Sequence, residues 1–183
     1  IVQHSATKHV GAIRPSIMVG ALARFNHNYK QLHPMAAAAA KELGLTKPST
    51  NTFMNSVAQL IEAIHCAENS LMLIDRLLER GLQSEPLVQP TKHGRGVGAV
   101  EVPRGLLIHD YTYDEQFRIT DNNLIIPTGM NMANMEYDMR AIVPKLLEAA
   151  KPEREIALTL EMLIRAYDPC ISCSTHMLDV KFV

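Results

Sequence analysis

The sequence predicts a mainly α-helical chain with a small inserted antiparallel β-sheet, an α+β fold. Helical spacing of apolar residues and an alanine-rich run indicate the helices, and a central stretch of short β-branched and aromatic runs indicates the sheet. The 183 residues, 47% of them hydrophobic and 20% charged, suffice for one globular domain with its own core. We therefore expect a single domain over residues 1–183.

Four helical regions are expected, at about residues 17–32, 36–43, 52–80 and 135–165. The second is rich in alanine, and Gly44 follows it as a stop signal. The third has an apolar face formed by Phe53, Val57, Leu60, Ile61, Ile64, Leu71, Ile74 and Leu78. The fourth contains Pro144 and Pro152, which predict at least two helices, the last starting at Glu153.

The β region is expected at about residues 96–127, as two or three strands joined by turns. Asp121-Asn122-Asn123 is turn-like, and the "LII" before Pro127 predicts a short buried strand. The segment "GRGVG" at the start of this region lacks the Gly-Lys-Ser/Thr end of a phosphate-binding loop, so we interpret it as a turn that leads into the sheet.

Composition excludes several classes of partner. The formal net charge is −1 and basic residues form no stripe, which argues against nucleic-acid binding. The apolar runs are far shorter than the roughly 18 residues of a membrane span. Three cysteines are too few for a disulfide framework, and no signal peptide is visible before the first motif, so we expect a cytoplasmic protein with reduced thiols.

Two of the three cysteines lie close to the C-terminus, in "DPCISCSTH". The spacing of Cys170 and Cys173 allows both sulfurs to face one soft or borderline metal ion, or to form a redox dithiol. A zinc site needs four ligands, and His176 would be only the third. Cys66 lies within a predicted helix, where we expect a small buried side chain. A pair of ordinary thiols stays open as the alternative.

The sequence around this pair is more restrictive than CxxC alone. "DPCISCSTH", "VPRG" followed by "LIHDY", "LIIPTGMN" and "MVGALARFN" resemble, in the right order, four motifs of nickel–iron hydrogenase large subunits. The segments "RAYDPCISCSTH" and "GAVEVPRGLLIHDY" are most similar in sequence to those of the soluble, cytoplasmic, multi-subunit members of the family. The resemblance implies a helical bundle of the large-subunit type, of which this chain is the C-terminal part, with a metal-binding segment at residues 168–176.

This resemblance implies a Ni–Fe centre held by four cysteines. Cys170 matches a terminal Ni ligand, and Cys173 matches the thiolate that bridges Ni and Fe. Carbon monoxide and cyanide would be the remaining ligands of the Fe ion. His176 matches the histidine that binds a separate Mg or Fe ion, with the backbone carbonyl of Leu124 as a further ligand.

Four other residues match positions around the metals. Arg104 matches the arginine above the open Ni–Fe position, and Asp168 the aspartate that orients it. Pro103 would line the pocket for the diatomic ligands, and Thr128 would bond a cyanide nitrogen. The residues alone leave other interpretations: Arg104 could be a surface side chain paired with Glu101 or Asp110, and Asp168 a turn residue before Pro169.

The resemblance also implies partners. The other two cysteine ligands belong to an N-terminal half, supplied by a longer version of this chain or by a separate polypeptide. Electrons would leave through an iron–sulfur small subunit and further subunits of the flavin/NAD(P), deazaflavin or ferredoxin type. These 183 residues alone are not expected to turn over hydrogen. The alternatives are a non-catalytic, hydrogenase-derived scaffold subunit and a zinc or dithiol protein.

Overall fold

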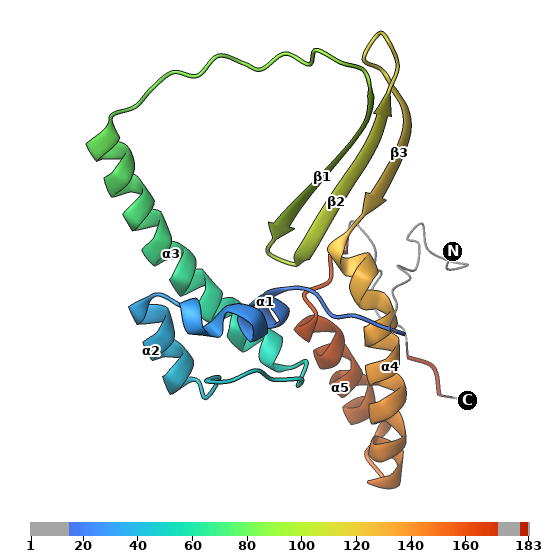
Figure 1. Ribbon diagram of the computed structural model, residues 1–183. Helices are drawn as coiled ribbons and strands as arrows, with labels where there is room; N and C mark the ends of the chain where they lie inside the picture. Colours follow the sequence, from blue (N-terminus) through green and yellow to red (C-terminus); the bar gives the residue numbers. More distant parts are fainter. Residues whose placement is uncertain (1–14, 172–179, 183) are drawn as a thin grey trace.

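The computed structural model describes residues 15–171 and 180–182. In chain order, the described elements are α1 (Ala21–Asn28), η1 (Tyr29–Gln31), α2 (Pro34–Glu42), α3 (Met54–Arg80), β1 (Gly94–Val102), β2 (Gly105–Tyr113), β3 (Ile119–Ile125), α4 (Pro127–Glu148) and α5 (Glu153–Ala166). The helices form a base from which the sheet projects (Figure 1). The predicted class, mainly helical with a small antiparallel sheet, is confirmed.

The N-terminal helices differ from the predicted ranges at their starts. α1 begins only at Ala21, because Gly20 has a φ of 119°, outside the helical region. α2 begins at Pro34, whose ring suits the first helical position. Its C-terminus is as predicted from the stop signal: Gly44 has a φ of 74°, and the Leu45 N–H donates to the Ala40 carbonyl.

The first half of α3 packs against α1 and α2, whereas its second half stands apart from the other described elements (Figure 1). Ala58 and Ile61 are buried between these helices. The predicted long helix is present, but its apolar face is uncovered in the second half, where Leu71 is 65% and Leu78 72% exposed. Within the described residues, nothing covers this half, so helical spacing alone did not produce burial.

The sheet is antiparallel in the order β1-β2-β3, with Val102 opposite Gly105 at the β1–β2 turn. The "GRGVG" segment is part of β1 and not a turn. The turn predicted at 121–123 lies inside β3, and the chain reverses at 114–118 instead, where the Asp114 carboxylate accepts the N–H groups of Gln116 and Arg118. β3 is also less buried than predicted, because the sheet meets the helices only at one end.

The predicted helical region at 135–165 is two helices, and the first starts earlier than expected. α4 begins at Pro127 and continues through Pro144. Pro144 removes one backbone hydrogen bond, but it lies on an exposed face where water can satisfy the released carbonyl. α5 starts at Glu153, with acidic residues in its first turn.

Two buried asparagines join the helices. The Asn131 side chain accepts the Val19 N–H at 2.8 Å and donates to the Val19 carbonyl at 3.2 Å. Asn55 accepts the Leu22 N–H at 2.9 Å and donates to the Ala166 carbonyl at 2.8 Å. Both side chains are at most 2% exposed, so these bonds satisfy backbone groups that water cannot reach. They fix the segment before α1 to α4, and α3 to the end of α5.

A third buried joint is formed by Tyr167, which is 2% exposed. Its hydroxyl donates to the Asp138 carboxylate and accepts from the Asn134 amide, each at 2.6 Å. Burial, and after it the bond to Asp138, raises the pKa of this phenol, which keeps it protonated as a donor. The joint holds the residue after α5 against α4.

The β1–β2 turn approaches the segment before α1 closely. Gly105 has a φ of 141°, and a Cβ placed on it would lie 2.5 Å from Val19 Cγ2. Gly20 lies under the same turn, where an added Cβ would be 3.2 Å from the Arg104 carbonyl oxygen. Only glycine fits this contact at Gly105.

We predict that Gly105→Ala destabilises the fold by about 2–3 kcal/mol, because it combines a left-handed backbone with a steric clash. Gly96→Ala, in β1 where an added Cβ meets nothing within 4 Å, is the matched control and should change the unfolding free energy little. Urea denaturation measures both. Equal effects of the two substitutions would contradict this account of the turn.

Candidate metal centre

The end of α5 turns the chain towards α4. Asp168 has a φ of 51°, an unusual value for a residue with a side chain, and its N–H donates to the Arg165 carbonyl. Two residues later the Cys170 N–H donates to the Thr128 hydroxyl oxygen at 3.2 Å. Thr128 is 3% exposed and lies in the first turn of α4. This bond places Cys170 beside the start of that helix.

Arg104, in the β1–β2 turn, faces the same region. Its Nε lies 3.5 Å from Asp168 Oδ1. The two alternative partners that the sequence offered are bound elsewhere: Glu101 pairs with Arg24, and Asp110 with Arg95. Arg104 and Asp168 are both partly exposed, so their attraction is screened by water and contributes little to stability.

The second oxygen of Asp168 accepts a hydrogen bond from Gln59 Nε2, on α3, at 2.9 Å. Sequence analysis did not identify Gln59. It belongs to none of the four motifs, and a glutamine on a helix surface carries no signal of its own. Asp168 is thus held from two sides, by an ion pair and by a neutral donor.

A cavity of about 240 Å³ lies where these segments meet. Its lining is Val102, Pro103, Arg104, Leu107, Ile126, Pro127, Thr128 and Cys170. The walls are mainly aliphatic, with one guanidinium, one hydroxyl and one cysteine. Because the Thr128 oxygen accepts the Cys170 N–H, its own proton can be donated to another acceptor. This lining suits a thiolate-bound metal with small ligands that accept a hydrogen bond.

The structure brings together five of the eight predicted site residues: Pro103, Arg104, Thr128, Asp168 and Cys170. Leu124 lies in β3 opposite His109, and the residue is 47% exposed. The predictions for Cys173 and His176 lie outside the described residues.

Cys170 is disulfide-bonded in the structure, so metal binding would require its reduction to the thiolate. Among the described residues, no three His, Cys, Asp or Glu side chains converge in a way that could hold a metal ion. The described part therefore offers one sulfur to a metal and needs ligands from elsewhere.

One side interpretation of the sequence is corrected. Cys66 is an exposed, free cysteine on α3 and not a buried side chain, because it lies on a face of α3 that borders an open cavity and not on the face that contacts α2. His109, in the "LIHDY" segment, is half-buried in β2, with Nδ1 3.0 Å from the Tyr111 hydroxyl. It lies in the projecting sheet, away from the helical core.

Comparison with known proteins decides the family. The profile described as nickel-dependent hydrogenase matches residues 14–176. The chain belongs to the nickel-dependent hydrogenase family. All four sequence motifs and the cavity at Cys170 lie within the matched range.

The relatives are hydrogenase subunits. The chain is 34% identical to sulfhydrogenase 1 subunit alpha of Pyrococcus furiosus, over 97% of this chain and 41% of that subunit. It is 36% identical to the NAD-reducing hydrogenase HoxS subunit beta of Cupriavidus necator, over 93% of this chain and 36% of that subunit. The chain thus spans about two fifths of the length of these relatives, a partial match that fits a C-terminal part.

A solved structure is also similar. The crystal structure of an NAD+-reducing [NiFe]-hydrogenase in the H2-reduced state matches with a TM-score of 0.73 and 32% identity, over 88% of this chain and 36% of that one. No helix among the described residues combines the length and the apolar character that crossing a membrane requires.

The strained conformation of Asp168 yields a stability prediction. Asp168→Asn keeps an acceptor for Gln59 and a side chain that tolerates this backbone, so the unfolding free energy should change by less than about 1 kcal/mol. Asp168→Ala should lower it by about 1–2 kcal/mol, because alanine disfavours a positive φ. Urea denaturation compares the two; a larger loss for the Asn variant would mean that the ion pair itself stabilises the fold.

Proposed function

We propose that this chain is the C-terminal, metal-binding part of a nickel–iron hydrogenase large subunit, in a helical bundle of that type, which oxidises hydrogen reversibly to protons and electrons. The supporting observation is that the "VPRG", "LIIPT" and "DPC" motifs, distant in sequence, supply Arg104, Thr128 and Cys170 to one cavity. A hydrogenase needs this combination of thiolate, cation and small-ligand pocket.

The residues have distinct roles in this proposal. Reduced Cys170 and Cys173 would supply two of the four thiolates that hold the Ni–Fe centre, Cys170 to the nickel and Cys173 to both metals. The two further thiolates would come from an N-terminal half, in the same or a separate polypeptide. Pro103 lines the pocket of the Fe-bound carbon monoxide and cyanide, and Thr128 donates to a cyanide nitrogen. His176 and the Leu124 carbonyl hold a Mg or Fe ion. Thiolates are the donors that Ni and Fe favour in such sites.

When bound, the metal pair supplies the Lewis acidity that polarises hydrogen. The reduced Cys170 sulfur would be the first acceptor of the proton released when the H–H bond breaks, and the electron pair of that bond would pass to the metal pair. Arg104 remains a cation throughout and stabilises charge as it separates. Asp168 acts as its anchor, limiting the positions that the long Arg104 side chain adopts.

The two electrons need an exit, and the three cysteines of this chain cannot also hold a cluster. The proposal therefore includes an iron–sulfur small subunit and further electron-transfer subunits of the flavin/NAD(P), deazaflavin or ferredoxin type, in the cytoplasm. The relative named as an NAD-reducing hydrogenase subunit supports a partner of the flavin/NAD(P) type.

A redox dithiol is the second candidate, because Cys170 is disulfide-bonded in the structure. Metal analysis and infrared spectroscopy of the complex purified through this chain distinguish the two. Nickel, together with the stretching bands of metal-bound carbon monoxide and cyanide, supports the hydrogenase. Zinc, or no metal, without such bands supports a zinc or dithiol protein or a non-catalytic scaffold.

Cys170→Ser should abolish hydrogen uptake while the assembled complex persists, because the nickel loses a terminal thiolate. Cys66→Ser is the control: it changes an exposed thiol on α3 and should leave uptake unchanged. Cys173→Ser should lose both metals, since a bridging sulfur holds the pair. Uptake at the wild-type rate in Cys170→Ser would refute the ligand assignment.

Arg104→Lys should lower turnover by at least about 100-fold while nickel, iron and the infrared bands are retained, because lysine keeps the charge but loses the planar fork. Arg95→Lys, at a guanidinium bound to Asp110 on the exposed sheet, is the matched control. If the bands disappear in Arg104→Lys, this arginine is structural and the catalytic role is wrong.

A further inference from the structure

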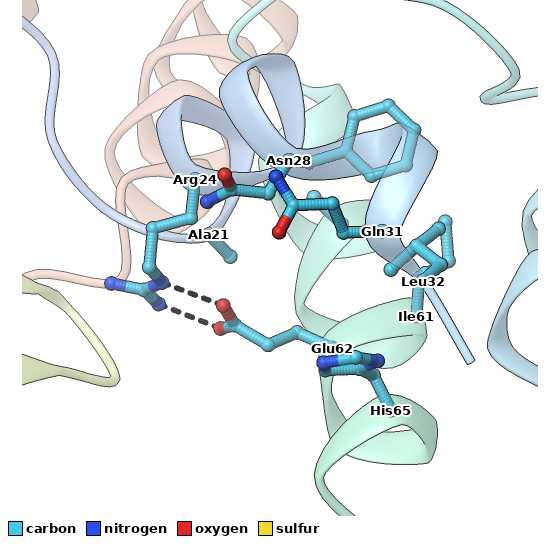
Figure 2. A pocket seen from close by; sticks show the side chains of 10 residues that line it. Ala21, Arg24, Asn28, Gln31, Leu32, Ile61, Glu62 and His65 are labelled. Atoms are coloured by element: carbon cyan, nitrogen blue, oxygen red, sulfur yellow. Dashed lines mark hydrogen bonds and ion pairs between the residues drawn. The ribbon is translucent and has the colours of Figure 1, made fainter. Parts of the chain in front are cut away.

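Two residues on one face of α3 point towards the β1–β2 turn and the end of α5. Gln59 donates to Asp168, as described above. Glu62, three residues on and therefore on the same helix face, binds Arg24 through both carboxylate oxygens, each at 2.6 Å (Figure 2). Neither Arg24 nor these α3 residues lines the cavity at Cys170.

Arg24 connects α3 to the turn. Besides Glu62, its guanidinium donates to the Glu101 carboxylate at 2.8 Å, to the Val102 carbonyl at 2.8 Å and to the Pro103 carbonyl at 2.9 Å. The last two acceptors are the carbonyls of the residues that directly precede Arg104. The side chain is only 18% exposed, and the bidentate geometry with Glu62 fixes the plane of the guanidinium.

The charge of Arg24 is permanent. The hydrogen bonds that Arg24 donates to Glu62 raise the pKa of the guanidinium against the opposing effect of burial, and Glu101 adds to the increase. The two backbone carbonyls therefore always face a cation.

Packing does not position this turn against α3. A cavity of about 500 Å³ lies between them, lined by Arg24, Gln59, Glu62, Ala63, Cys66, Glu101, Val102 and Pro103. On its other side the turn packs closely, through Gly105 against Val19. On the side that faces α3, polar bonds span the cavity in place of close-packed side chains. The position of Arg104 relative to α3 thus depends on these hydrogen bonds as well as on the Gly105 contact.

We propose that Arg24 and Gln59 are positioning residues for Arg104. Arg24, oriented by Glu62, fixes the backbone from which Arg104 extends, and Gln59 fixes the carboxylate that receives its side chain. One turn of α3 thereby controls both ends of the Arg104–Asp168 pair, whose own contact of 3.5 Å is long and partly exposed. The inference rests on the proposed function for the reaction that Arg104 serves.

The test uses the assembled complex with Gln59→Met and Arg24→Lys. Methionine keeps the length of glutamine but donates no hydrogen bond, and lysine keeps the charge without the fork. Each variant should lower hydrogen turnover about 10- to 100-fold, the cost of a small misplacement of a reacting group. Nickel, iron and the infrared bands should be retained. Gln83→Met, in the exposed segment after α3, and Arg118→Lys, at the far end of the sheet, are matched controls.

Double-mutant cycles separate positioning from general stabilisation. If Gln59 acts through Asp168, Gln59→Met should cost less than about twofold in an Asp168→Ala background, which removes the acceptor, and Arg24→Lys likewise in an Arg104→Lys background. Additive losses in both cycles, or a loss of activity that follows loss of metal, would overturn the proposal.

Amide hydrogen exchange of the peptide spanning Val102–Leu106 gives a readout independent of metal. Arg24→Lys should speed its exchange about tenfold relative to Arg118→Lys, and unchanged exchange would contradict the role of Arg24. If the wild-type complex lacks nickel, the proposed function fails, and the exchange measurement still decides whether Arg24 holds the turn.

Discussion

The close contact between the β1–β2 turn and the segment before α1 is the constraint on which the site depends. Gly105 permits it, since any Cβ there would overlap Val19. Asn131 of α4 holds Val19 by its backbone, so the same contact also sets the turn relative to the start of α4. Arg104 and Thr128 reach one cavity for this reason, and Cys170 joins them through Thr128.

Two arginine–carboxylate pairs near this contact differ in strength. Arg24 and Glu62 are mostly sheltered and joined by two short bonds, which makes them a rigid support. Arg104 and Asp168 form a single longer contact, partly open to water. The rigid Arg24–Glu62 pair holds the backbone at Arg104. The looser Arg104–Asp168 pair leaves the Arg104 guanidinium able to shift its position when the charge in the cavity changes. The stronger pair is structural, and the weaker pair faces the cavity.

The sequence predicted the fold class, the long helix α3 and the segments that meet at the site. These features carry local signals: glycines that end helices, helical spacing of apolar residues, and motifs with fixed residues. Prediction from the sequence failed where burial or a hydrogen bond depends on residues that are distant in the chain. The exposure of Leu71 and Leu78 reflects the absence of a covering element in the described part of the chain. The helix α4 continues through Pro144 because this residue lies on a solvent-exposed face, where water can bond the carbonyl that loses its partner. Gln59 and Arg24 were missed as supports because only the folded chain brings them beside Asp168 and the turn.

The exposed second half of α3 has a consequence for how the polypeptide behaves in solution. Leu71, Ile74 and Leu78 present aliphatic surface, and Leu87 and Val88 in the following segment are 89% and 93% exposed. Surfaces of this kind promote self-association when a chain is present without whatever covers them. The chain produced by itself would therefore aggregate as its concentration rises, and co-expression with a polypeptide that covers α3 would increase its soluble yield.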